Sequence, residues 1–175
     1  MLLDAGEKRF LARFLAIFFG LFAVLLLADL RALNEAIASV QAGLLALSGL
    51  PVVQHGILLS SGNSAATIVN ECSGLVMVIL LAALLYASQM PESRRRRTLL
   101  IFTPFLLAFN IARLFLTLRA FFTAGALFDY VHVLLWFVDS AVVLSIWYMA
   151  FSSPHAPAPA GNLKQYKRRA RKPPS

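Results

Sequence analysis

Charged residues are scarce in this chain of 175 residues. Asp, Glu, Lys and Arg make up 14% of the sequence, against about a quarter in an average soluble domain. Hydrophobic residues make up 59%, and the mean hydropathy is +0.75. A soluble core of this size needs more polar residues to cover its surface. The composition therefore excludes an ordinary soluble fold and predicts that lipid covers part of the molecule.

Cysteine is nearly absent, since Cys72 is the one example. A single thiol forms no internal disulfide, which excludes a disulfide-stabilised scaffold. A lone cysteine is most often a buried apolar side chain and less often a reactive nucleophile. No histidine–cysteine group has metal-ligand spacing, and no glycine-rich phosphate loop occurs. We therefore expect neither a metal nor another cofactor.

Four apolar segments qualify as membrane spans, since a helix needs about 20 apolar residues to cross roughly 30 Å of hydrocarbon. Open sheet edges are not tolerated in lipid, so all four should be helices. The segments are 10–28, 74–89, 99–118 and 131–151. The sequence therefore predicts an all-α integral membrane protein with four transmembrane helices in a membrane domain of residues 1–151.

Basic residues form three clusters that predict the orientation in the membrane. They lie around the start of the first span, between the second and third spans, and in the proline-rich tail 152–175. Because basic residues favour the cytoplasmic side, four spans would place every cluster and both termini in the cytoplasm, as in a cytoplasmic membrane. The tail should be disordered and attracted to anionic lipid. The net charge of +8 thus indicates membrane flanks, and we expect no nucleic acid partner.

Residues 33–70 are predicted to lie at the outer face. Segment 33–50 is apolar with a helical period, but a fifth span here would turn the four-arginine cluster outward, against the charge rule. We expect an interfacial amphipathic helix that lies on or dips into the membrane and ends at Pro51. Segments 52–59 and 65–69 predict a short β-hairpin on the same side. The apolar stripe of the helix comprises Leu33, Ile37, Val40, Leu44 and Leu47.

Three residues that could take part in a reaction fall at one predicted depth, near the outer face. Cys72 precedes the second span, His132 opens the fourth, and Arg113 lies about 21 Å along the third. A charge within a span costs at least about 2.5–3.5 kcal/mol and points to function, unless the arginine snorkels to the interface. Cys72 as a packed thiol and His132 as an interfacial histidine remain alternatives. Together the three could supply a nucleophile, an acid/base and an electrophile.

Other polar residues could support these three. Asn110 lies one helical turn before Arg113 and could orient its guanidinium or bridge two helices. Glu71 and Asp129, at the outer interface, could contact His132 or Arg113, or remain solvated. Asp139 lies about 10 Å deeper than His132, too far to orient it directly, and could pair with an arginine or act as a buried relay.

Three motifs resemble those of the exosortase/archaeosortase family. They are Glu71-Cys72-Ser73-Gly74 before an apolar helix, Asn110-Ile111-Ala112-Arg113 within a span, and His132 at the start of the last helix. The resemblance covers roughly residues 52–150, and the order of the motifs is the family's order. Trp136 stands where the family often has glycine, and the chain has fewer predicted spans than larger members.

The resemblance implies a membrane cysteine transpeptidase or protease that acts at the extracytoplasmic face. Cys72 would be the nucleophile, His132 the acid/base and Arg113 the stabiliser of the oxyanion or substrate. The substrates would be exported proteins with a C-terminal motif, a transmembrane helix and a basic cluster. A non-catalytic scaffold that binds a partner's membrane helix is the alternative. A transporter or channel is disfavoured, because the first two spans have no polar stripe.

Overall fold

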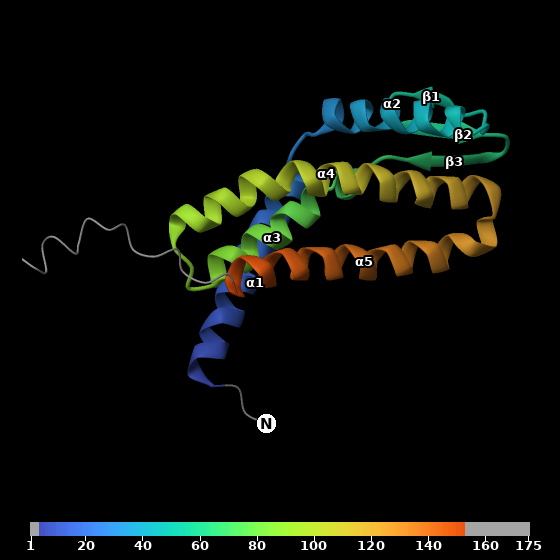
Figure 1. The fold of residues 1–175 in the computed structure, drawn as a ribbon. Helices are drawn as coiled ribbons and strands as arrows, with labels where there is room; N and C mark the ends of the chain where they lie inside the picture. The colour runs from blue at the N-terminus through green and yellow to red at the C-terminus, as the bar shows by residue number, and fades with distance from the viewer. Residues whose placement is uncertain (1–3, 153–175) are drawn as a thin grey trace, which may run out of the picture.

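The computed structural model describes residues 4–152, apart from the side chains of residues 126 and 127. The predicted tail, from residue 153 onward, lies outside the described residues. Helices dominate, and a small sheet lies with α2 on one side of α4, while α5 lies on the other (Figure 1). The elements are α1 (Ala5–Leu27), α2 (Arg31–Leu47), β1 (Val53–His55), β2 (Leu58–Ser61), β3 (Ser64–Thr67), the 3₁₀ helix η1 (Asn70–Ser73), α3 (Leu75–Ala87), α4 (Glu92–Thr123) and α5 (Gly125–Ser152).

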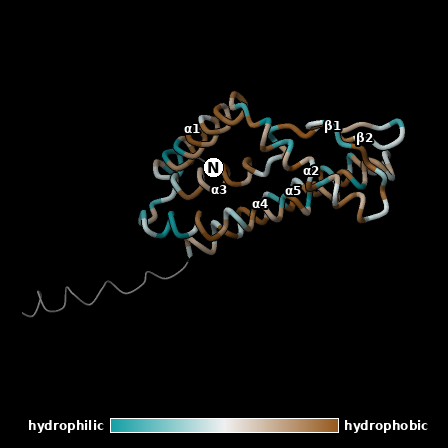
Figure 2. The backbone as a smooth tube through the Cα atoms, turned by 90° about the horizontal axis from the view of Figure 1, so that it is seen from above, coloured by the Kyte–Doolittle hydropathy of each residue, from teal (hydrophilic) through white to brown (hydrophobic). Residues whose placement is uncertain are grey.

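Three of the described helices, α1, α4 and α5, are long and apolar enough to cross a membrane. Most of their side chains are exposed in the isolated chain: Leu100 is 78% exposed and Phe137 is 70% exposed. Hydrophobic residues run along these helices, whereas hydrophilic ones gather where α4 begins (Figure 2). These surfaces need lipid as their solvent, so the predicted helical membrane fold is confirmed.

The second predicted span, 74–89, is shorter than expected. Its helix, α3, has 13 residues, or about 20 Å of length, which is less than the roughly 30 Å of hydrocarbon. Four transmembrane helices are therefore not confirmed. α3 is nevertheless central, because its buried side chains pack with α4 and α5 in the main core, and α1 also lies against it. That core comprises Met77, Leu81, Leu84, Leu85, Met90, Leu106, Val143 and Ile146.

The arginine cluster lies within a helix. Arg94, Arg95 and Arg96 occupy the first turns of α4, where Glu92 forms ion pairs of 3.3 and 2.9 Å with Arg95 and Arg96. Such pairs three and four residues apart favour helix. α4 therefore starts seven residues before the predicted span 99–118 and carries its basic residues at one end.

The segment predicted for the outer face contains α2, which contacts β1 and β2 of a small sheet. Two amides on the buried face of α2 have partners: Asn34 donates to Asn70 Oδ1 at 2.8 Å, and Gln41 donates to Ile111 O at 2.9 Å. These two amides lie on the buried face of α2, and Leu47 of the predicted apolar stripe is left 87% exposed. The stripe is thus divided, since Ile37 is buried while Leu33, Val40 and Leu47 are exposed.

The predicted hairpin is extended by one strand. Residues 52–59 do not form a single strand, because a turn at Gly56, with φ +60°, separates β1 from β2. Gly62, with φ +57°, turns β2 into β3, so the three antiparallel strands pair in the order β1-β2-β3. Leu59 and Ile68 join a second core with α2 and the C-terminal part of α4, and Cys72 packs at its edge.

Candidate active site

Cys72 lies in η1, the single 3₁₀ turn that precedes α3. Its amide donates to Val69 O at 2.8 Å, and Ser73 Oγ donates to Asn70 O at 2.6 Å. The turn ends at Gly74, which adopts the left-handed conformation with φ +80°. The thiol is half-buried. A tight turn of this kind holds the sulfur at a fixed position just before a helix.

Asn70 anchors this turn to the rest of the fold. Its Nδ2 donates to Leu25 O and Ala28 O, both at 3.0 Å, at the end of α1. Its Oδ1 accepts from Asn34 of α2 at 2.8 Å. The sequence analysis did not identify Asn70, since its partners lie 36 to 45 residues away. Three hydrogen bonds thus fix the Cys72 turn against two helices.

Asn110 joins two of the sequence motifs. Its Nδ2 donates to Cys72 O at 2.8 Å from α4. Gly74 faces the same side chain so closely that a Cβ at this position would lie 2.8 Å from Asn110 Cβ. Asn110 itself is 1% exposed. The cysteine motif and the Asn-x-x-Arg motif therefore meet, and the close approach requires glycine.

Arg113 pairs with Asp139 across α4 and α5. Its Nε lies 3.1 Å from Asp139 Oδ2, and the two side chains are 10% and 13% exposed. In the part of the chain that the structure describes, Asp139 is the one ion-pair partner of this guanidinium, and Asp139 Oδ1 has no hydrogen bond. The carboxylate compensates the buried charge and fixes its position. The sequence left two roles open for Asp139, pairing with an arginine or acting as a buried relay. In the structure it pairs with Arg113.

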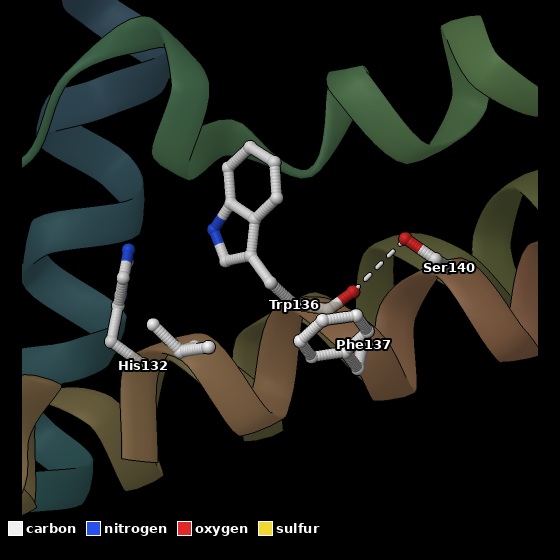
Figure 3. A pocket seen from close by; sticks show the side chains of 5 residues that line it. His132, Trp136, Phe137 and Ser140 are labelled. Carbon is white, nitrogen blue, oxygen red and sulfur yellow. Dashed lines mark hydrogen bonds between the residues drawn. The ribbon is translucent and has the colours of Figure 1, made fainter. Parts of the chain in front are cut away.

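His132 lies on α5, seven residues before Asp139. This spacing separates the two residues by about 10 Å along the helix axis. Its ring stacks on Phe128 at 5.5 Å between centroids, and Trp136 lies at 6.4 Å. Its Nδ1 is buried without a hydrogen bond among the described residues. The His132 and Trp136 rings rise from one side of α5 and line a groove of about 420 Å³ with Val133, Phe137 and Ser140 (Figure 3). Trp136 thus forms a wall of this groove.

A comparison with known families adds an independent line of support. The model of the transmembrane exosortase family matches residues 1–150. The chain belongs to this family. Exosortases are membrane cysteine transpeptidases, so the suspected family and a coarse assignment as a membrane enzyme are confirmed. No curated protein and no solved structure matches the chain.

Four residues of the candidate site form two connected pairs, and His132 is separate from both. The backbone carbonyl of Cys72 accepts a hydrogen bond from Asn110, and Arg113 forms an ion pair with Asp139. Within residues 4–152, no hydrogen bond or ion pair links the side chains of Cys72, Arg113 and His132 to one another. The structure therefore leaves their catalytic roles as predictions.

The predicted supporting acids stand apart from these pairs. Glu71 and Asp129 are exposed, and neither has a side-chain hydrogen bond or ion pair with any described residue. The described residues also contain no group of three His, Cys, Asp or Glu side chains that could hold a metal.

Replacing Gly74 by alanine should destabilise the protein. A non-glycine residue in the left-handed region costs about 1–2 kcal/mol, and the new Cβ would clash with Asn110. We expect the unfolding temperature of the detergent-purified protein to fall by roughly 5 °C. Gly20→Ala in α1, where no atom lies within 4 Å of the added Cβ, is the control and should be neutral or stabilising. Equal melting temperatures for Gly74→Ala and the parent would contradict this account of the turn.

Proposed function

We propose that this exosortase is a membrane-embedded cysteine protease or transpeptidase that cleaves the C-terminal sorting signals of exported proteins at the outer face of the cytoplasmic membrane. The observation that carries the proposal is the hydrogen bond from Asn110 Nδ2 to Cys72 O. It joins the cysteine motif to the helix that carries Arg113. Family membership supplies the chemistry of the thiol.

Cys72 Sγ attacks the carbonyl carbon of the scissile peptide bond. Its proton passes to His132, which then donates it to the departing amine, leaving a thioester between the exported protein and Cys72. An acceptor amine or water next attacks the thioester, loses a proton to His132 and restores the thiol. In an enzyme without substrate, the hydrogen bond between a nucleophile and its base is often long and tightens only when substrate binds. The bound peptide would therefore contact both Cys72 and His132.

Arg113 is the proposed electrophile. It would donate to the oxygen that becomes negative as the tetrahedral intermediate forms. The 3.1 Å ion pair with Asp139 supports this role, since it keeps the guanidinium inside the bundle instead of at the interface. A donor held in place before the reaction needs no reorganisation in the transition state.

We also propose that the four segments cross the membrane with both termini in the cytoplasm. Arg94, in the second basic cluster, donates to Ala150 O near the end of α5 at 3.3 Å. The first basic cluster, at the start of α1, lies beside the same end of α5, where Arg9 and Phe151 line one pocket. Clusters at one end agree with the preference of basic residues for the cytoplasm. Neighbouring helices surround α3, so its short length need not match the lipid.

The substrate's membrane helix would lie along the outer half of α5. Trp136 and Phe137, 56% and 70% exposed, give this surface an apolar character beside His132. A helix packed there would bring the peptide before it toward the groove. The substrate's basic cluster would then lie in the cytoplasm, with the positive ends of α1 and α4.

Labelling of the thiol tests the proposal. The parent protein in intact spheroplasts should react with a membrane-impermeant maleimide, and processing of a co-expressed substrate should stop in proportion to the labelled fraction. Cys72 is the one cysteine, so Cys72→Ser is a matched control that should remain unlabelled. A thiol that resists the probe in the folded protein but reacts after denaturation would instead support the non-catalytic scaffold.

A further inference from the structure

A second pocket lies at the other end of α3 from Cys72. It has a volume of about 490 Å³ and lies between the start of α1, the residues that follow α3, and the last turns of α5. The proposed reaction uses none of its residues. Two arginines, three aromatic residues and one amide give it its character: Arg9, Arg13, Phe10, Trp147, Phe151 and Gln89.

The floor of the pocket is aromatic and fixed in place. Trp147 lies 6.2 Å from Phe10 and 5.8 Å from Phe151, measured between ring centroids. The indole Nε1 of Trp147 donates to Ser88 Oγ at 2.8 Å, and Ser88 Oγ in turn donates to Leu84 O at 2.7 Å. The polar atoms here therefore satisfy one another, and the floor offers an apolar surface to a ligand.

The rim of the pocket is positive. Arg9 and Arg13 are four residues apart and share one face of α1. Both are exposed, and among the residues the structure describes neither side chain has an ion pair or hydrogen bond. The two acids nearest in sequence are engaged elsewhere, since Asp4 and Glu7 form the N-terminal capping box of α1. The pocket therefore has positive charge without an acidic partner.

We propose that this pocket binds an anionic phospholipid from the cytoplasmic leaflet. Its phosphate would lie between the guanidinium groups of Arg9 and Arg13, whose planar forks match phosphate geometry. The start of an acyl chain would pack on Phe10, Trp147 and Phe151. Basic pockets between membrane helices on the cytoplasmic side are suited to such head groups. The chain's own basic tail has the wrong charge for this site, and free phosphate would leave the aromatic floor uncovered.

Fluorescence quenching by brominated lipid can test this proposal in the full-length protein. The chain has two tryptophans, so a Trp136→Phe background leaves Trp147, in the pocket, as the reporter. In phosphatidylcholine nanodiscs, a small fraction of acyl-brominated phosphatidylglycerol should quench Trp147 more strongly than the same fraction of brominated phosphatidylcholine. Removing both arginines, Arg9→Gln/Arg13→Gln, should lower the affinity for the anionic lipid roughly 100-fold, since each lost charge-assisted hydrogen bond to the phosphate contributes about tenfold.

A second arginine pair distinguishes a site from a general charge effect. Arg96→Gln/Arg97→Gln removes the same charge from the same end of the molecule and should retain the preference for phosphatidylglycerol. Equal losses in the two double variants, or equal quenching by the two brominated lipids, would overturn the proposal. Displacement of the brominated lipid by inorganic phosphate would assign the pocket to soluble phosphate instead. Binding should persist in Cys72→Ala, so this result is independent of the proposed function.

Discussion

Replacing Cys72 by alanine should abolish processing of a co-expressed substrate while the amount of exosortase in the membrane stays unchanged. Loss of a catalytic nucleophile in a hydrolase lowers turnover by roughly a millionfold, far below detection in cells. The thiol is small and half-buried at the edge of the outer core, so alanine leaves the packing nearly intact. Immunoblots of the substrate and of the enzyme measure both quantities in one sample.

Two further variants show whether the loss comes from the sulfur. Cys72→Ser keeps the shape of the side chain but supplies a much weaker nucleophile, so it should also be inactive. His55→Ala removes an exposed histidine in β1, outside the proposed reaction, and should process the substrate normally. Full processing by Cys72→Ala would eliminate the cysteine mechanism and leave the scaffold as the better reading.

Breaking the pair between Arg113 and Asp139 should have the second largest effect. Asp139→Asn leaves a guanidinium that is 10% exposed without its counter-charge, which costs about 3–5 kcal/mol for a buried pair. We expect the unfolding temperature in detergent to fall by roughly 10 °C and processing to fall with it. Arg113→Leu should destabilise similarly, because it isolates the carboxylate.

The double variant separates stability from chemistry. Replacing both partners by leucine removes both charges, and apolar replacement of a buried pair is often neutral or stabilising. Arg113→Leu/Asp139→Leu should therefore recover the parent's unfolding temperature yet remain inactive if Arg113 stabilises the oxyanion. Recovery of both stability and processing would limit the pair to a structural role.

The sequence predicts the long helices well because lipid imposes a simple rule of length and apolarity. It does not predict where α3 ends, since residues 74–89 read as one apolar segment. The end depends on Ser88, which bonds to Leu84 O and also accepts from Trp147, 59 residues away. Contacts over such distances have no local signal. The separation of β1 from β2 has a different cause, because a single turn at Gly56 divides residues 52–59 into two strands.

The residues proposed for the candidate site have sequence signals, whereas the contacts among them do not. Spacing predicts that Cys72, Arg113 and His132 lie near the same ends of three helices, but it does not fix the register of one helix against another. The register of α4 and α5 follows from Arg113 and Asp139, and it places His132 about 10 Å from Asp139 along the axis of α5. Asn70 could not be found, because backbone carbonyls at the end of α1 are its partners.

The short length of α3 bears on the fate of the thioester. A helix of 13 residues falls about 10 Å short of the hydrocarbon thickness, and Asn110, which holds Cys72, lies about 17 Å along the apolar part of α4. With α4 crossing the bilayer, the acyl group would be held on a half-buried residue below the lipid head groups, open to outside reagents but in less water than a fully exposed site. We therefore expect slow hydrolysis and a long-lived acyl-enzyme, so that aminolysis by an incoming acceptor outcompetes water.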